Sequence, residues 1–204
     1  MLRQHRSLFI AVYCGSLPGI KESYAAAARE TAARCAQVGF GIVFGGSAVG
    51  LMGELARSAR VAGCEIIGVT LRALSGFESP AEGLTDLVVV KTLHQRKQVM
   101  SDRAHAVVVL PGGVGSLDEA FEALTWKQIG LHSKPIIFVN IDGYWEPLRQ
   151  LVAHMQREGF VSEASARNIE FASSVAAAIA TINSRLTDQH PSADTPSSTS
   201  IGGA

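Results

Sequence analysis

A glycine-rich turn joins a short apolar run to a helix-like segment at two places in this chain. One turn spans Gly45 to Gly53, and the other spans Pro111 to Glu119, with the sequence PGGVGSLDE. The first turn of a helix has unpaired backbone N–H groups and the positive end of the helix dipole, and glycines let an anion approach them closely. Ser116 adds a hydroxyl donor and a candidate helix cap. The two turns together predict one ligand of nucleotide size.

Neither turn completes a familiar motif. Gly45 to Gly50 has the glycine spacing of a P-loop, but Leu51 and Met52 stand where lysine and serine or threonine are required. The same turn reads G-x-S-x-x-G, and no carboxylate follows the next predicted strand, which argues against a dinucleotide dehydrogenase. The G-x-S-x-G of a nucleophile elbow is missing from both turns. The pattern therefore excludes three common enzyme classes.

Composition limits the remaining choices. A chain of 204 residues that is 47% hydrophobic can bury one core. Its eighteen basic and eighteen acidic residues cancel, which argues against nucleic-acid and anionic-membrane partners. No apolar run approaches the roughly 18 residues of a membrane span, so a cytoplasmic location is the expectation. The cysteines lie in apolar segments and the histidines lack metal-ligand spacing, so reduced thiols and no metal are expected.

Short apolar runs alternate with helix-like segments along the chain. The runs predicted as strands are 8–13, 42–44, 66–69, 87–90, 106–110 and 136–140. The segments predicted as helices are 24–38, 51–61, 93–103, 117–129, 145–157 and 174–183. This order predicts an α/β fold: a single Rossmann-like, doubly wound parallel sheet with helices on both faces. Ligands of such sheets bind beyond the carboxyl ends of the strands, where both glycine turns fall.

The composition of the chain ends sets the expected domain boundaries. Residues 184–204 are rich in serine, threonine, proline, aspartate and glycine, so they predict a disordered C-terminal tail. Residues 1–7 predict a flexible N-terminus. The nucleotide-binding domain is then expected to span residues 8–183.

A third segment begins a helix at the same rim of the sheet. Thr92 and Gln95 fit a capping box directly after a predicted strand. Arg96 and Lys97 then lie in the first turns, where they could meet a phosphate or polarise a leaving base. A solvated basic pair on a surface helix explains them equally well. Spacing alone leaves both interpretations open.

Glu119 also has two interpretations. Ser116 and Glu119 are spaced as a capping box, in which the carboxylate accepts the backbone N–H of Ser116. An acid at this point of a phosphate-binding helix is also placed to contact ribose hydroxyls or a water that attacks the anomeric carbon. The capping interpretation is favoured on spacing alone.

Taken together, these segments resemble the LONELY GUY (LOG) family of cytokinin riboside 5'-monophosphate phosphoribohydrolases, long labelled lysine decarboxylase-like. The resemblance extends from the turn at Cys14 to about Ile182. Its specific signals are the paired arginine and lysine and the P-G-G-x-G-[T/S]-x-x-E run at this separation. The segments that carry it are Thr92–Lys97, Met100, Pro111–Glu119, Thr125–Trp126 and Asn140–Tyr144.

The resemblance implies a Rossmann-like homodimer without a metal or redox cofactor. Its implied reaction is hydrolysis of the N-glycosidic bond of AMP or an N6-prenylated AMP, which releases the free base and ribose 5-phosphate. The implied catalytic residues are Arg96 and Glu119. The implied substrate-binding residues are Gly46, Glu78, Lys97, Met100, Gly112, Gly113, Val114, Gly115, Ser116 and Thr125.

Four positions depart from the family pattern. Ser116 replaces a threonine and Leu93 replaces a methionine, and both changes keep the chemistry. Ser47 replaces a glycine and His105 an aspartate, and these two are expected near or behind the pocket, where they could alter base preference. The choice between AMP and a prenylated AMP therefore stays open.

Two alternatives to the hydrolase differ in class. The first is a nucleotide-binding carrier of the same fold, such as the molybdenum-cofactor carriers that resemble this family. The second is a pyridoxal-phosphate-dependent lysine decarboxylase. A small domain with no lysine beside the glycine turns disfavours the decarboxylase, and the presence of both Arg96 and Glu119 favours the hydrolase over the carrier.

Overall fold

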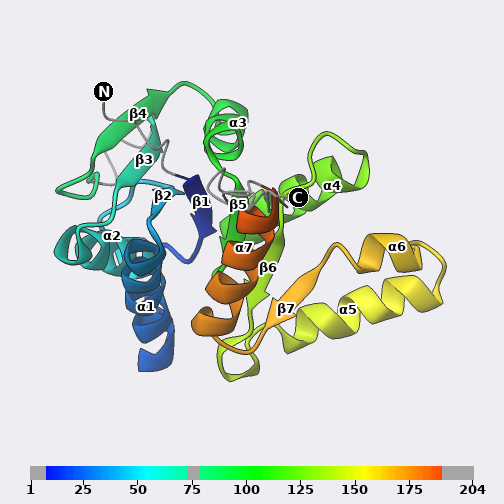
Figure 1. Cartoon of the computed structure of the whole chain (residues 1–204). Coiled ribbons are helices and arrows are strands. Elements are labelled where there is room, and N and C mark those ends of the chain that lie inside the picture. Colours follow the sequence, from blue (N-terminus) through cyan, green and yellow to red (C-terminus); the bar gives the residue numbers. More distant parts are fainter. Residues whose placement is uncertain (1–7, 73–78, 190–204) are drawn as a thin grey trace, which may run out of the picture.

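The computed structural model describes residues 8–72 and 79–189, and it contains one parallel sheet (Figure 1). Seven strands form this sheet in the order β4-β3-β2-β1-β5-β6-β7. Every neighbouring pair is parallel, so all carboxyl ends meet at one edge. The strands are β1 (Leu8–Tyr13), β2 (Phe40–Phe44), β3 (Ile66–Leu71), β4 (Asp86–Val90), β5 (Ala106–Val109), β6 (Ile136–Val139) and β7 (Glu170–Ala172).

The helices cover both faces of the sheet, as a doubly wound fold requires. They are α1 (Glu22–Val38), α2 (Gly50–Ala62), α3 (Leu93–Arg103), α4 (Val114–Gln128), α5 (Glu146–Arg157), α6 (Glu163–Ala166) and α7 (Val175–Gln189), with a 3-10 turn, η2, at Ile141–Gly143. Side chains of α1, α2 and α7 form one core with the sheet. Side chains of α3, α4 and α5 form a second core on the other face. The predicted fold class is confirmed.

The alternation of side chains along the central strand explains the two cores. In β1, Ile10 and Val12 belong to the first core and Ala11 and Tyr13 to the second. Ile10 aligns with Ile42 of β2 on one side and with Ala106 of β5 on the other. A strand that is apolar at every position can therefore be buried on both faces.

The edges of the sheet differ from the expectation. β4 was expected to be apolar on both sides, but it is an edge strand in which Val89 is 51% exposed. The opposite edge is β7, which the sequence pattern does not predict. β7 is too short to give a clear alternating pattern, and it is defined by its pairing with β6. Short edge strands depend on tertiary context more than on local sequence.

The predicted start of the C-terminal tail at Ser184 is wrong. α7 continues to Gln189, and Leu186 is buried against the same core as Ile179 and Ile182. Arg185 also forms a two-pronged ion pair with Glu170 of β7, at 2.7 Å for each N···O distance. The apolar period therefore extends past the point where the composition becomes polar. Residues 1–7 and 190–204 lie outside the described residues.

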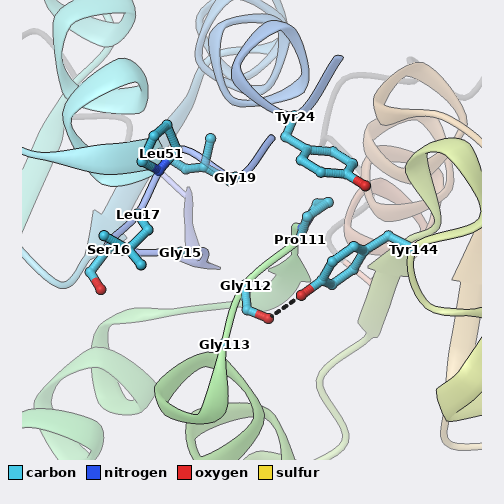
Figure 2. A pocket seen from close by; sticks show the side chains of 11 residues that line it. Gly15, Ser16, Leu17, Gly19, Tyr24, Leu51, Pro111, Gly112, Gly113 and Tyr144 are labelled. Atoms are coloured by element: carbon cyan, nitrogen blue, oxygen red, sulfur yellow. Dashed lines mark hydrogen bonds between the residues drawn. The ribbon is translucent and has the colours of Figure 1, made fainter. Parts of the chain in front are cut away.

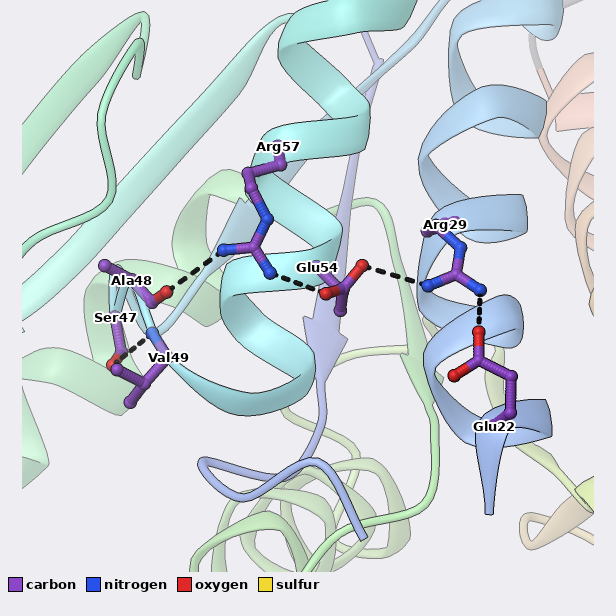
Figure 3. Close-up of polar contacts among 7 residues, drawn as sticks. All are labelled: Glu22, Arg29, Ser47, Ala48, Val49, Glu54 and Arg57. Carbon is purple, nitrogen blue, oxygen red and sulfur yellow. Dashed lines mark hydrogen bonds and ion pairs between the residues drawn. The ribbon is translucent and has the colours of Figure 1, made fainter. Parts of the chain in front are cut away.

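A chain of polar contacts ties α1 to α2 and reaches the first glycine turn (Figure 3). Arg29 of α1 pairs with Glu22 on its own helix and with Glu54 of α2, the latter at 3.1 Å. Glu54 also accepts a hydrogen bond from Arg57 at 2.6 Å, and Arg57 donates to the carbonyl of Ala48 at 3.4 Å. The Arg57 hydrogen bond is the main cause that lowers the pKa of Glu54 below its usual value.

The described helices include none with the length and apolarity of a membrane span.

Candidate active site

The strand order reverses its direction between the paired strands β1 and β5, and a hydrogen bond joins the loops that leave these strands. The backbone N–H of Gly15, after β1, donates to the carbonyl of Pro111, after β5, at 3.1 Å. The carbonyl of Gly15 in turn accepts from the N–H of Leu51 in α2 at 3.0 Å. This is the topological switch point at which doubly wound folds bind their ligands. The structure thus brings the two predicted glycine turns to one place.

Helix α4 begins earlier than the sequence predicts. Gly113 is its N-cap, and the first intrahelical bond runs from the N–H of Leu117 to the carbonyl of Gly113 at 3.1 Å. Ser116 therefore lies inside the first turn and does not cap the helix. The favoured interpretation of Ser116 and Glu119 as a capping box is wrong, because Val114 and Gly115 already belong to the helix and Gly113 is its N-cap. Glu119 is consequently left for another contact.

The start of α4 presents an open row of backbone. A Cβ built on Gly113 or on Gly115 would meet no atom within 4 Å, and Val114 is 84% exposed. Ser116 instead points inward: it is buried, and a Cβ on Gly112 would lie 2.2 Å from its Oγ. The amides of a first helical turn have no intrahelical acceptor. This turn therefore has the geometry of an anion site.

Arg96 is held by the backbone at the ends of two strands. Its Nε donates to the carbonyl of Val69 in β3 at 2.9 Å, and its Nη2 donates to the carbonyl of Gly45 after β2 at 2.9 Å. A Cβ on Gly45 would come within 2.1 Å of that Nη2, so only glycine leaves room for the guanidinium. The Arg96 side chain is 14% exposed. It is thus a fixed part of the site, and the solvated-pair interpretation does not apply to it.

Glu119 faces the guanidinium of Arg96. The distance from Arg96 Nη1 to Glu119 Oε1 is 3.7 Å, and the Glu119 side chain is 12% exposed. Burial raises the pKa of Glu119 to about 7, against the opposing effects of Arg96 and Lys97 and with a smaller contribution from Asp118. Burial and this carboxylate also raise the pKa of Cys14 at the end of β1. A carboxyl group that titrates near neutrality and sits next to a fixed cation is typical of catalytic sites.

Lys97 pairs with two acids of α4. Its Nζ lies 3.0 Å from both carboxylate oxygens of Asp118 and 3.0 Å from Oε2 of Glu122. Burial lowers the pKa of Lys97, but these two carboxylates outweigh it and leave the pKa above its usual value. Glu122 is not among the residues predicted from the sequence, although its i+4 spacing from Asp118 places both acids on one helical face. Lys97 therefore links α3 to the helix that carries Glu119.

The second glycine turn, at Pro111 to Gly113, also forms one wall of a cavity of about 250 Å³ (Figure 2). The loop after β1 supplies another wall through Gly15 to Gly19, and Tyr24 and Tyr144 close the far side. The hydroxyl of Tyr144 donates to the carbonyl of Gly112 at 2.7 Å. Tyr144 appears in the sequence signature, but no local pattern indicates this contact across the chain.

Other residues predicted to bind substrate have different positions. Met100 is fully buried in the core, because its turn of α3 faces the sheet, so the structure does not bring it to the site. Thr125 lies near the far end of α4, where its hydroxyl donates to the carbonyl of Phe121 at 2.7 Å. Gly46 is buried with a positive φ of 80°, and its carbonyl accepts from the N–H of Ala81 at 2.9 Å. Glu78 lies outside the described residues.

Ser47 and His105, the two departures expected to affect base preference, lie in different parts of the fold. Ser47 is buried in the first glycine turn, and its Oγ accepts from the N–H of Val49 at 3.4 Å. His105 directly precedes β5, and its Nδ1 accepts from the N–H of Phe9 at 3.1 Å. His105 thus lies at the amino edge of the sheet, opposite the carboxyl edge where the two glycine turns meet. Within residues 8–72 and 79–189, no group of three acidic, histidine or cysteine side chains is arranged to hold a metal.

Comparison with known proteins identifies the family of this chain. The family model described as "Possible lysine decarboxylase" matches residues 52–182. A cytokinin riboside 5'-monophosphate phosphoribohydrolase of Rhodococcoides fascians is 38% identical over 176 residues, which cover 86% of this chain and 89% of the relative. A rice (Oryza sativa subsp. japonica) relative of the same description is 37% identical over 82% of this chain and 69% of its own length.

Solved structures give the same fold at lower identity. The molybdenum cofactor carrier protein of Chlamydomonas reinhardtii has a TM-score of 0.68 at 22% identity, over 89% of this chain and 99% of that one. The molybdenum cofactor binding protein of Rippkaea orientalis has a TM-score of 0.69 at 20% identity, over 90% and 100%. At these identities the likeness concerns the fold alone. The family match and the sequence relatives together show that this chain belongs to the LOG, or lysine decarboxylase-like, family.

Proposed function

We propose that this protein hydrolyses the N-glycosidic bond of a nucleoside 5'-monophosphate, AMP or an N6-prenylated AMP, to the free base and ribose 5-phosphate. The observation that carries the proposal is the buried carboxyl group of Glu119 opposite Arg96, on the helix that begins at the glycine turn. The names of the sequence relatives support the same reaction.

In the proposed complex, the 5'-phosphate binds the first-turn amides of α4 at Gly113, Val114 and Gly115, with the Gly112 peptide and Ser116 completing the turn. Backbone donors and the helix dipole make this an anion site. Binding energy at the phosphate then orients the glycosidic bond, which lies away from it.

The chemical step breaks the bond between the anomeric carbon and the base nitrogen, and the electron pair leaves with the base. The ribose gains oxocarbenium character, which the ionised Glu119 carboxylate stabilises. Glu119 accepts a proton from the attacking water as the new C–O bond forms, and this proton then passes to the departing base, which restores the carboxylate. Arg96 stabilises negative charge on the base. Lys97 balances the negative charge of Asp118 and Glu122 on α4.

Purified protein incubated with AMP and, separately, with isopentenyladenosine monophosphate tests the proposal by chromatography. We expect free base and ribose 5-phosphate from the unmodified protein, and neither product from Glu119→Ala or Arg96→Ala. The relative rates rank the two substrates. Folded variants that keep full activity contradict the assignment of the pair.

A nucleotide carrier is the second candidate, because the carrier proteins named above share this fold. A carrier binds AMP and releases it intact, so recovery of unaltered nucleotide from a protein that binds it supports this candidate instead. A homodimer and a cytoplasmic location complete the proposal. Family resemblance supports the dimer, which light scattering tests, and the buried free thiols of Cys35 and Cys64 suit a reducing compartment.

A further inference from the structure

The peptide bond between Gly112 and Gly113 has an unusual partner. Its carbonyl oxygen accepts the hydroxyl of Tyr144 at 2.7 Å, a contact that spans 32 residues of sequence (Figure 2). A trans peptide is planar, so its C=O and N–H point in opposite directions. A Gly112 carbonyl directed at Tyr144 therefore aims the N–H of Gly113 away from Tyr144.

The glycines at this peptide make its orientation depend on the contacts that it forms. Glycine residues flank it on both sides, and without a Cβ on either side a peptide rotates at low cost. Gly113 is exposed, and a Cβ built on it would meet nothing within 4 Å. The hydrogen bond from Tyr144 is thus a main restraint on the orientation of the Gly113 N–H.

The ring of Tyr144 is itself held from two sides. It packs edge-on against Tyr24 of α1, with ring centroids 5.4 Å apart, and against Trp145, at 4.8 Å. Trp145 is buried, and its backbone N–H donates to Oδ1 of Asn140 at 2.7 Å. The turn between β6 and α5 therefore presents the Tyr144 hydroxyl at a defined position.

We infer that Tyr144 is a positioning residue for the phosphate site. Its hydroxyl holds the Gly112–Gly113 peptide in the orientation that lets the Gly113 N–H join the first-turn amides of α4 as a donor to the 5'-phosphate. A hydrogen bond to the carbonyl also polarises the peptide and strengthens its N–H as a donor. The inference rests on the proposed function, because it assumes that the phosphate binds at this turn.

Tyr144→Phe removes the hydroxyl and keeps the ring. We expect this variant to bind ribose 5-phosphate about fivefold more weakly in calorimetry, the effect of one ordinary hydrogen bond. The KM for AMP should rise by a similar factor while kcat changes little, because the remaining first-turn amides still hold the phosphate in register and so still orient the glycosidic bond. The affinity for adenine is the internal reference, since a general loosening of the fold weakens the binding of both ligands.

Thr181→Val is the matched control. It also removes a hydroxyl that donates to a backbone carbonyl, that of Ala177 at 2.9 Å, but Thr181 lies on α7 and does not line the cavity. We expect its affinity for ribose 5-phosphate to equal that of the unmodified protein. Equal losses in both variants, or no loss in Tyr144→Phe, would overturn the inference and leave the hydrolase proposal standing. An unmodified protein that neither cleaves AMP nor binds ribose 5-phosphate would overturn the proposed function itself.

Discussion

Arg96 and Glu119 face each other across 3.7 Å, but the backbone carbonyls of Val69 and Gly45 hold the arginine in place. The guanidinium therefore keeps its position whether or not Glu119 is ionised. Burial of Glu119 outweighs the attraction of Arg96 and raises its pKa to about 7. The carboxyl group can thus gain and lose a proton near neutral pH beside a cation that does not move.

Arg96→Lys tests whether the fork of the guanidinium is needed. A lysine ammonium is a single point charge and cannot donate to two separated carbonyls in the same geometry. We expect kcat for AMP to fall about 100-fold and the free energy of unfolding to fall by about 1–3 kcal/mol, measured by product release and urea titration. Arg103→Lys is the control, because Arg103 lies on the same helix in an exposed pair with Asp86. Near-normal kcat in Arg96→Lys would argue for a simple charge effect.

The activity should depend on the ionisation of Glu119. Its carboxylate must be charged to stabilise the oxocarbenium ion, and kcat/KM reports ionisations of the free enzyme. We expect kcat/KM for AMP to rise with pH up to about 7, the pKa of Glu119, and then to level off. Initial rates between pH 5 and 9 measure this, and a profile without an acidic limb would contradict a role for the ionised form.

Lys97→Met should move that acidic limb to higher pH. The charge of Lys97 lowers the pKa of Glu119, so its removal favours the protonated carboxyl group. The second ionisation of the 5'-phosphate, at about pH 6, is the same for both proteins, so the shift between the two profiles belongs to Glu119. Arg103→Met, which removes a cation from the exposed end of α3, should leave the profile in place. A shift of the limb toward lower pH would contradict the electrostatic account.

Glu119→Gln should change how stability varies with pH. The folded protein holds a proton on Glu119 up to about pH 7, whereas the unfolded chain releases it near 4.5. The free energy of unfolding contributed by this group therefore falls as the pH rises through that window. We expect the variant to gain up to about 3 kcal/mol over the unmodified protein above pH 7. Urea unfolding at several pH values measures the difference in the free energy of unfolding between the two proteins. A difference that does not change with pH would refute the raised pKa.

Gly115→Ala should separate stability from binding. Gly115 lies in the first turn of α4 with open space around it, so a methyl group causes no clash. Alanine in a helix is favoured over glycine by about 0.5–1 kcal/mol, so we expect the thermal midpoint to rise. The same methyl group stands where the phosphate is proposed to approach, so affinity for ribose 5-phosphate should fall about tenfold. Unchanged affinity in this more stable variant would place the phosphate elsewhere.

The sequence predicts most of the fold because the buried strands are continuous apolar runs. Gly39 and Gly63 end α1 and α2 in the left-handed conformation, which glycine adopts without strain. β7 and the end of α7 are not predicted, because each depends on contacts made across the chain, such as the pair between Arg185 and Glu170. Local composition cannot report such contacts.

The site is predicted in its parts but not in its contacts. The family resemblance selects Arg96 and Glu119, whose roles the residue types and spacing alone leave open. Those types and spacing do identify the glycine turn. They do not show that Gly113 begins α4, and the capping-box interpretation of Glu119 fails for that reason. Nor do they show that Arg96 reaches Gly45 and Val69, which lie in loops and strands brought near by the sheet. The spacing of residues in the sequence identifies candidate site residues. The order of the strands in the parallel sheet determines which of these residues come into contact.

Gly113 and Glu119 belong to one helix, so the separation between the anion site and the carboxyl group does not depend on any loop. At about 1.5 Å of rise per residue, α4 acts as a gauge of roughly 9 Å. A ligand therefore fits only if its phosphate and its reacting bond are separated by this fixed length, and no part of the protein has to move. One residue inserted between these positions would turn Glu119 by about 100° around the helix axis and away from Arg96, whereas the same insertion before Gly113 would leave the gauge intact.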